Sequence, residues 1–396
     1  MSLRSSGLAE GTAEQPIRLV AAAPVPSPGA WAGIELRGAD DRSLMRRCII
    51  THAASLAIWS GAPRIENCEL RNGLKGIVMN GREARPTLEG NRVADMLEGG
   101  IDSINGSAPT ITGCTVERCG PFCIGASQSA SPVITGTTVG FCETGIALVR
   151  VPPLLKGNTV RDNGIGIAFN QANGGKPVEG NRIEKNKQGI LCTNFSSPAI
   201  AGNVIAENQE GVVCSMGARP RISGNDIVRN GTGVVADQIS SPELEANEFR
   251  DNEKGVYLNL SSYATIHGNN FTGNRIHVEL GNMSADWERR AAGKPKRGLQ
   301  RLLTARTERT GMPSNPASGD GASLPDFVDA RGNWWGEATT REMEEKGPDA
   351  NLAALIDGHD VPVRVYEGFE GEFAQDKIMY TPWAKERISG AGVGAR

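Results

Sequence analysis

The sequence predicts an all-β fold, a right-handed parallel β-helix solenoid with three short strands in each turn of about 22 residues. The first observation is self-similarity at this period across residues 153–274, which is typical of a solenoid. Asparagine recurs with the period at Asn158, Asn181, Asn203, Asn225, Asn247 and Asn269. A second asparagine follows each of these after five residues. The segments between them alternate apolar and polar residues over a few positions only, which favours short strands over helices.

Other repeated residues fit the same turn. A proline begins each repeat, as at Pro177 and Pro198, where it would be the first residue of a strand. A glycine precedes an inward aliphatic residue in almost every turn, as in Gly189-Ile190. We expect the asparagines at the corners, because asparagine tolerates the left-handed backbone conformation. Stacked on the next turn, the six asparagines of the first set should also form a structural ladder of amide hydrogen bonds.

Composition restricts the classes of function. The 42 basic and 45 acidic residues give a net charge of -3, which argues against a nucleic-acid-binding protein. No apolar run reaches 18 residues, so no transmembrane span is expected. The sequence begins Met1-Ser2-Leu3-Arg4, without a signal peptide, and leads into what looks like the middle of a domain. We therefore expect a piece of a longer, exported protein of the periplasm or cell surface.

The eight cysteines are predicted to be buried free thiols that stack within the repeat. Cys192 and Cys214, for example, fall on one inward column. A bridge between adjacent turns stays open as an alternative, because strands about 4.8 Å apart are within disulfide range. No pair has the Cys-x-x-Cys spacing, which argues against a structural zinc site.

The repeat divides the chain into three parts. Residues 1–283 form the parallel β-helix, 284–326 a basic helical or linker insertion, and 327–396 the last turn and a C-terminal capping tail. The insertion contains a helical leucine pattern at 299–303 and a linker-like stretch at 313–321. The motif Asn333-Trp334-Trp335-Gly336 then returns to the repeat, and its tryptophans should cover the open sheet edges at the last turn.

With these repeats and the terminal Asn-Trp-Trp-Gly, the chain resembles the pectate-lyase-like β-helix repeat proteins, the broad NosD-like and CASH-domain group. The resemblance covers residues 8–283 and 333–336, and it implies a fold far more than an activity. Motifs of the pectate lyases, polygalacturonases and C5-epimerases are missing. The stretch 357–360, Asp-Gly-His-Asp, is similar to the Asp-Pro-His-Asp of epimerases, but it lacks the proline and lies in the tail.

No catalytic, cofactor-binding or metal-binding residue is predicted. A hydrolase needs two carboxylates about 5–9.5 Å apart, and Glu66 and Glu89 on adjacent turns are the strongest candidates. Their column is mixed, which favours a solvated surface; it continues with Thr112, Thr135, Lys156, Glu179, Ala201, Ser223, Glu245 and His267. Asp40-Asp41 fits a turn. The four histidines, which are scattered and form no metal-ligand pattern, are His52, His267, His277 and His359.

The short loops between turns indicate flat faces without a catalytic cleft. The leading hypothesis is a non-catalytic scaffold that binds a glycan or a protein partner along one face. The alternatives are a polysaccharide-active lyase, hydrolase or epimerase, and an exported accessory protein of the NosD type. Oligomeric state is not predicted.

The basic insertion is the one candidate partner-binding element. Its residues are Arg289, Arg290, Lys294, Lys296, Arg297 and Arg301. They could dock an acidic partner, an anionic polymer or a lipid surface. The alternative is a helix that lies on the β-helix with its leucines inward and its cations in solvent.

Overall fold

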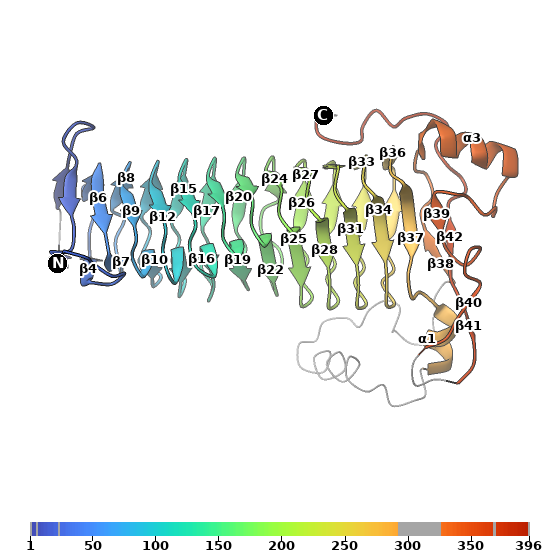
Figure 1. Cartoon of the computed structure of the whole chain (residues 1–396), viewed down its shortest axis with the longest axis horizontal. Coiled ribbons are helices and arrows are strands. Elements are labelled where there is room, and N and C mark those ends of the chain that lie inside the picture. The colour runs from blue at the N-terminus through green and yellow to red at the C-terminus, as the bar shows by residue number, and fades with distance from the viewer. Residues whose placement is uncertain (1, 5–6, 23, 292–325, 367–369, 395–396) are drawn as a thin grey trace.

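The computed structural model describes residues 2–4, 7–22, 24–291, 326–366 and 370–394. The chain winds into a long three-sided prism, whose strands follow one another from the N-terminal to the C-terminal end (Figure 1). Each full turn contributes one strand to each of three sheets, and every strand pair in these sheets is parallel. The predicted parallel β-helix is therefore confirmed.

Three sheets, named A, B and C here, form the sides of the prism. Sheet A consists of β1 (Ser2–Arg4), β4 (Trp31–Arg37), β7 (Ala53–Ile58), β10 (Lys75–Asn80), β13 (Gly99–Ile104), β16 (Phe122–Ala126), β19 (Thr144–Val149), β22 (Ile165–Asn170), β25 (Gln188–Thr193), β28 (Glu210–Cys214), β31 (Thr232–Ala236), β34 (Lys254–Leu258), β37 (Ile276–Leu280) and β39 (Leu355–Ile356). Sheet B consists of β2 (Leu8–Glu10), β5 (Leu44–Arg46), β8 (Arg64–Glu66), β11 (Thr87–Glu89), β14 (Thr110–Thr112), β17 (Val133–Thr135), β20 (Leu154–Lys156), β23 (Val178–Glu179), β26 (Ala199–Ala201), β29 (Arg221–Ser223), β32 (Glu243–Glu245) and β35 (Thr265–His267). Sheet C consists of β3 (Ile17–Leu19), β6 (Cys48–Thr51), β9 (Glu69–Arg71), β12 (Arg92–Ala94), β15 (Thr115–Glu117), β18 (Thr138–Gly140), β21 (Thr159–Arg161), β24 (Arg182–Glu184), β27 (Val204–Ala206), β30 (Asp226–Val228), β33 (Glu248–Arg250) and β36 (Asn270–Thr272).

The core is a stack of aliphatic side chains that point into the prism. Alternate strand residues face inward, and the register places like residues above one another, such as Ile167, Ile190 and Val212 on sheet A. All three are fully buried. A single turn could not bury such a column, so each turn depends on its neighbours for stability.

The corner conformation differs from the prediction. The left-handed residue between sheets B and C is the one before the asparagine, as at Gly180 and Gly202, where φ is 64° and 63°. Between sheets C and A it is again the preceding residue, for example Lys185 with φ of 56°. The asparagine side chain itself turns into the prism and is buried, so it stabilises the corner from inside rather than by adopting the bend.

The asparagines form two ladders along the prism, and the predicted stacking is confirmed. In the first ladder the backbone N–H of Asn203 donates to Oδ1 of Asn225 at 2.9 Å, and its side-chain Nδ2 donates to the same oxygen at 2.9 Å. The pattern repeats over Asn158, Asn181, Asn203, Asn225, Asn247 and Asn269. Asn333 continues it after the insertion, because Asn269 N–H donates to its Oδ1 at 2.8 Å. The second ladder runs from Asn163 to Asn274.

The C-terminal end of the prism is capped. Trp335 is fully buried and stacks on Phe271, with ring centroids 4.7 Å apart. It leads into α3 (Gly336–Lys346), and β39 then pairs with β37 at the end of sheet A. His277 lies beneath this cap, with Nε2 3.1 Å from the Trp335 carbonyl oxygen, and burial lowers its pKa to about 4.

The remaining elements hold the tail against the last turns. Strand β38 (Phe327–Asp329) pairs with β42 (Lys377–Met379), and β40 (Val363–Arg364) pairs with β41 (Phe373–Ala374). After β42 the tail turns back along sheet C towards the middle of the prism (Figure 1). On this path Gly392 donates to the Ala246 carbonyl at 2.9 Å and Val393 donates to Asp226 at 2.8 Å.

The thiol prediction requires a correction. Cys123 and Cys142 form a disulfide with a Cα–Cα distance of 5.8 Å, and the other six cysteines are free and buried. The bridge joins adjacent turns. Cys123 points inward from β16, and Cys142 occupies the position that asparagine holds in the second ladder. The expected stack of Cys192 on Cys214 is present, because the two are paired in register. Burial raises the pKa of the Cys119 thiol to about 11, so this thiol is unreactive at neutral pH.

Candidate functional site: the outer face of sheet A

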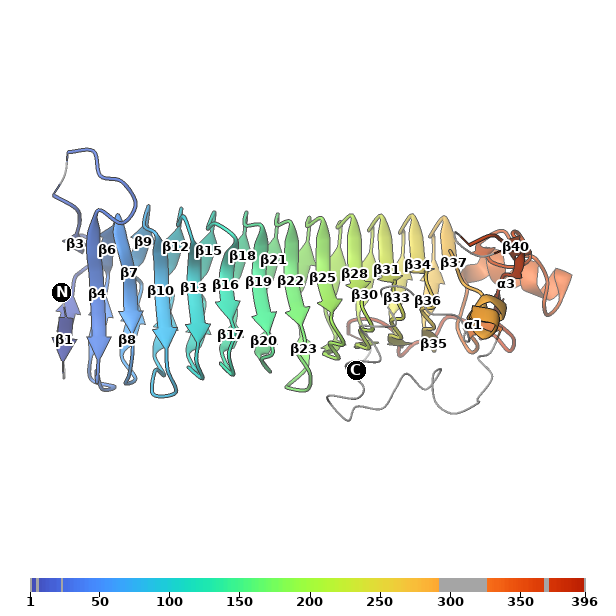
Figure 2. The same ribbon diagram turned by 90° about the horizontal axis from the view of Figure 1, so that it is seen from below.

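The outer face of sheet A is the largest regular surface of the prism, and Figure 2 shows its strands side by side. The central outward position of each strand forms a column that we name the floor. In order from β19 to β34 the floor consists of Ala147, Ala168, Leu191, Val213, Val235 and Tyr257. These apolar side chains are half-buried or buried although they point out of the prism. A run of apolar residues on an outward face marks a candidate binding surface.

Polar columns, which we name the walls, border the floor on both sides. The wall at the start of the strands contains Gln188, Glu210, Thr232 and Lys254. The wall at their end contains Asn170, Thr193, Ser215, Asp237 and Asn259. Hydrogen bonds run along the walls, for example Gln188 Nε2 to Glu210 at 2.9 Å and Asn259 Nδ2 to Asp237 at 3.0 Å. Each turn from β25 to β34 therefore offers one apolar contact between two polar ones, whereas Ile165 of β22 and Val149 of β19 place apolar side chains at wall positions.

A cluster of polar groups surrounds Tyr257 at the C-terminal end of the floor. The Lys254 ammonium lies 5.0 Å from the tyrosine ring centroid and 2.9 Å from the Glu279 carboxylate. Burial raises the pKa of the Tyr257 phenol, and the negative charge of Glu279 adds to the shift. The phenol is therefore neutral at physiological pH and can donate a hydrogen bond.

A second cluster lies around Phe122 of β16, next to the N-terminal end of the floor. Asp102 occupies the floor position of β13, next to Gly125 of β16. Burial raises the pKa of the Asp102 carboxyl, while the nearby positive charge of Lys75 opposes the shift. Neither Phe122 nor Tyr257 could be recognised in the sequence, because the repeat pattern alone does not show how a side chain lies on a face.

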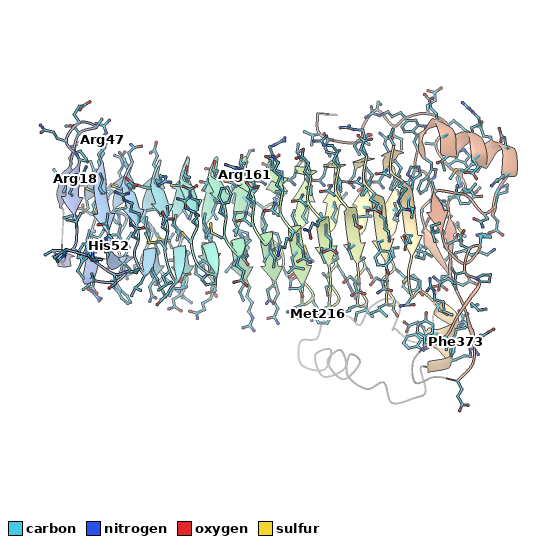
Figure 3. All side chains as sticks on the ribbon, in the orientation of Figure 1. Arg18, Arg47, His52, Arg161, Met216 and Phe373 are labelled. Atoms are coloured by element: carbon cyan, nitrogen blue, oxygen red, sulfur yellow. A yellow bond between two sulfur atoms is a disulfide. The ribbon has the colours of Figure 1, made fainter. Side chains whose placement is uncertain are left out.

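The predicted docking residues are only partly within the described chain. Arg289 and Arg290 lie in α1 (Ala285–Ala291), whereas Lys294, Lys296, Arg297 and Arg301 lie outside the described residues, as does the predicted helix at 299–303. The Arg290 guanidinium pairs with Asp286 and lies 4.1 Å from the ring centroid of Phe373, which Figure 3 labels beside α1. Arg290 thus helps to hold α1 against β41, and its role as a docking residue remains a prediction.

The candidate carboxylates Glu66 and Glu89 are paired in register on sheet B, as expected. Glu66 is buried and forms ion pairs with Arg46, at 2.8 Å, and with Arg64. Both oxygens of the Glu66 carboxylate are therefore engaged by guanidinium groups of sheet B. The pair is therefore better explained as part of the ionic surface of sheet B.

The two remaining acidic motifs, at 40–41 and 357–360, make contacts that stabilise the local backbone. Asp40 accepts hydrogen bonds from the backbone N–H and the side chain of Arg42, as in a turn. Asp357 is buried and accepts from the backbone N–H groups of His359, at 2.8 Å, and Ile378, at 2.7 Å. Its carboxylate therefore ties the tail to β42.

The described residues contain no group of three or more histidine, cysteine, aspartate or glutamate side chains that could hold a metal ion. Within the same residues, no helix is long and apolar enough to cross a membrane.

Comparison with known proteins agrees with this architecture. Residues 29–205 match the family described as the right handed beta helix region, and residues 124–296 match the family described as NosD, a periplasmic copper-binding protein. No curated protein sequence matches the chain.

Two solved structures share the fold. The A-module of the Azotobacter vinelandii mannuronan C-5 epimerase AlgE4 is 16% identical with a TM-score of 0.53, and the match covers 67% of this chain and 87% of that one. A double mutant of the periplasmic alginate epimerase AlgG is 14% identical with a TM-score of 0.50, and the match covers 63% of this chain and 74% of that one. At these identities the likeness extends to the fold alone.

Proposed function

We propose that this right-handed parallel β-helix protein, which carries a NosD domain, binds an extended polysaccharide along the outer face of sheet A. The observation that carries the proposal is the repetition of one apolar floor position and two polar wall positions in successive turns. Turns are about 4.8 Å apart, which is close to the length of one pyranose unit in an extended chain. A polymer with one sugar per turn would make similar contacts at each turn from β25 to β34.

The chemistry of the face also suits sugars. The apolar C–H surface of a pyranose can pack on the floor, while its hydroxyl groups exchange hydrogen bonds with the amides, hydroxyls and carboxylates of the walls. Ligand sites of this kind need only a few directed polar groups beside an apolar surface. A flat protein partner would use the apolar floor but would not need walls that repeat at every turn.

The test is a matched pair of arginine substitutions. Ala168→Arg places a long charged side chain on the floor of sheet A, and Ala201→Arg places the same side chain on the outer face of sheet B, where the alanine is also half-buried. Binding of the purified chain to a panel of immobilised polysaccharides should be lost in the first variant and kept in the second. Equal binding by both variants, or no binding by the unmodified chain, would contradict the proposal.

Catalysis on the bound polysaccharide is the second candidate function, and the Tyr257 cluster favours it. Tyr257, Lys254 and Glu279 bring a phenol, an ammonium and a carboxylate together, and proton transfer at a sugar carbon or oxygen uses such groups. Tyr257→Phe removes the phenol and keeps the ring. If the protein is an enzyme, this variant should bind polysaccharide but release no product or epimer detectable by mass spectrometry or proton NMR.

The copper in the description of the NosD family does not suit the described residues. The six free cysteines are buried inside the prism, and the described residues lack a cluster of three metal ligands. Two observations support an exported location, in the periplasm or at the cell surface. The Cys123–Cys142 disulfide is typical of an oxidising compartment, and the NosD family and the alginate epimerase AlgG are both described as periplasmic.

A further inference from the structure

We infer that the ligand of the sheet A face is an uncharged oligosaccharide of about seven sugar units, whose two ends stack on the rings of Phe122 and Tyr257. The inference rests on the proposed function and adds to it the substrate class, the length of the binding site and the two anchor residues.

Phe122 lies flat on the face because two glycines leave room for its ring. A side chain at Gly99, on the turn below, would meet the ring at 2.7 Å, and one at Gly125 would meet it at 2.8 Å. Oδ1 of Asp102 lies 3.1 Å from the place that a Cβ atom at Gly125 would occupy. The ring is half-buried, so its outer surface forms an aromatic platform with a carboxylate at its edge.

Tyr257 occupies the floor position of β34, whereas Phe122 starts from the wall column and its ring reaches over the floor position of β16, Gly125. A side chain at Gly281, on the next turn, would meet the phenol oxygen of Tyr257 at 2.5 Å and Oδ1 of Asn259 at 2.7 Å. The phenol therefore lies across the neighbouring turn, over a glycine, as the Phe122 ring does. Both platforms combine an aromatic ring with hydrogen-bonding groups at its edge, which is the arrangement that fits the apolar surface and the hydroxyl rim of a pyranose.

The separation of the two rings sets the length of the ligand. Six steps separate β16 from β34 in sheet A. At about 4.8 Å a step, the rings are about 29 Å apart along the prism, which an extended chain of about seven pyranose units would span. The floor between them contains only aliphatic residues, from Ala147 to Val235. The interior of the ligand would thus make weak, repeated contacts, and its ends would make the strong ones.

The charge of the face selects the class of glycan. Between β10 and β37 its outward charged side chains are Lys75, Lys254, Asp102, Glu210, Asp237 and Glu279. Carboxylates outnumber the two lysines, and both lysines already lie near carboxylates, Lys75 4.0 Å from Glu98 and Lys254 2.9 Å from Glu279. A polyuronate would bring one more negative charge at each turn, so the face favours an uncharged chain.

The experiment measures affinity against ligand length by calorimetry. The probes are gluco-, manno- and xylo-oligosaccharides with β-1,4 linkages and lengths of two to eight units, together with oligomannuronates of the same lengths. We expect affinity for at least one neutral series to rise up to about seven units and then level off. Phe122→Ala and Tyr257→Ala should each weaken the seven-unit ligand about tenfold, whereas Tyr257→Phe should keep its affinity.

Controls separate the anchors from the fold and from the proposed function. Phe141→Ala removes an aromatic ring that is exposed at the corner between sheets C and A, away from the floor, and should leave affinity unchanged. Phe122→Leu keeps an apolar contact if the alanine variant proves unstable, and should still lose affinity. The inference would be overturned if oligomannuronate bound more tightly than the neutral series, or if both alanine variants kept full affinity for the neutral series. The proposed function would stand in either case. Absence of binding to every probe would overturn both.

Discussion

Asn225, in the middle of the first ladder, gives the sharpest test of what holds the prism together. Its side-chain Nδ2 donates to the carbonyl oxygens of Ile200 at 2.9 Å and Ser223 at 3.1 Å. Its Oδ1 accepts from both the backbone N–H and the side-chain Nδ2 of Asn203. The residue is fully buried, so water cannot replace these partners after Asn225→Ala.

The expected cost follows from the groups that lose a partner. The Asn203 side chain keeps its bonds to the carbonyl oxygens of Val178 and Ala201, but its backbone N–H loses its acceptor. A buried donor without a partner costs about 1–3 kcal/mol, and the small cavity adds about 1 kcal/mol. We therefore expect Asn225→Ala to lower the free energy of unfolding by about 2–4 kcal/mol.

Denaturant unfolding and amide hydrogen exchange together measure this effect. Long repeat proteins can unfold in stages, so the exchange rate of the Asn203 amide gives a local reading that the global midpoint does not. Asn282→Ala is the matched control, because Asn282 is exposed outside the ladder. If Asn225→Ala lowers stability no more than this control does, or leaves exchange at Asn203 unchanged, the ladder is not a major source of stability.

Three further predictions concern the disulfide, the cap and the contact of α1 with β41. Denatured protein without reductant should show six titratable thiols, and eight after reduction; eight at the outset would exclude the Cys123–Cys142 bridge. Because burial lowers the pKa of His277 from 6.5 to about 4, stability should fall by up to about 3 kcal/mol as the pH drops through this interval, and His277→Gln should remove that slope. Arg290→Ala should lower the free energy of unfolding by about 1 kcal/mol, because the contact with Phe373 is lost. An unchanged midpoint of thermal unfolding would mean that this contact contributes nothing to stability.

The repeat in the sequence was sufficient to predict the fold and the register. Asparagines spaced by one turn must lie above one another, and the paired strands then follow, as Asn181 and Asn203 show. The left-handed residue at each corner was assigned wrongly, because period alone does not distinguish the bend from the inward residue beside it. Glycine at 180, 202 and 224 was the available signal, since glycine adopts positive φ at little cost.

The disulfide and the binding face depend on contacts between columns, which a period cannot show. Cys123 and Cys142 belong to different columns of adjacent turns, so alignment of the repeats does not pair them. The platform at Phe122 likewise needs a glycine one turn below it, 23 residues earlier in the chain. Gly99 was visible in the sequence as an extra glycine beside the regular Gly100, but only the register gives it a role.

The ladders and the proposed binding face depend on the same property of the prism. A polymer gains from repeated weak contacts only if the spacing and direction of the walls stay constant over many turns, since any drift would add up along the ligand. The buried ladders fix this spacing from inside, because each Oδ1 after the first in a ladder receives two donors from the adjacent turn. Rigid columns also remove the entropic cost of ordering the walls when the ligand binds. The asparagines would therefore serve binding without touching the ligand, which explains why polar side chains occupy an interior that aliphatic residues could fill.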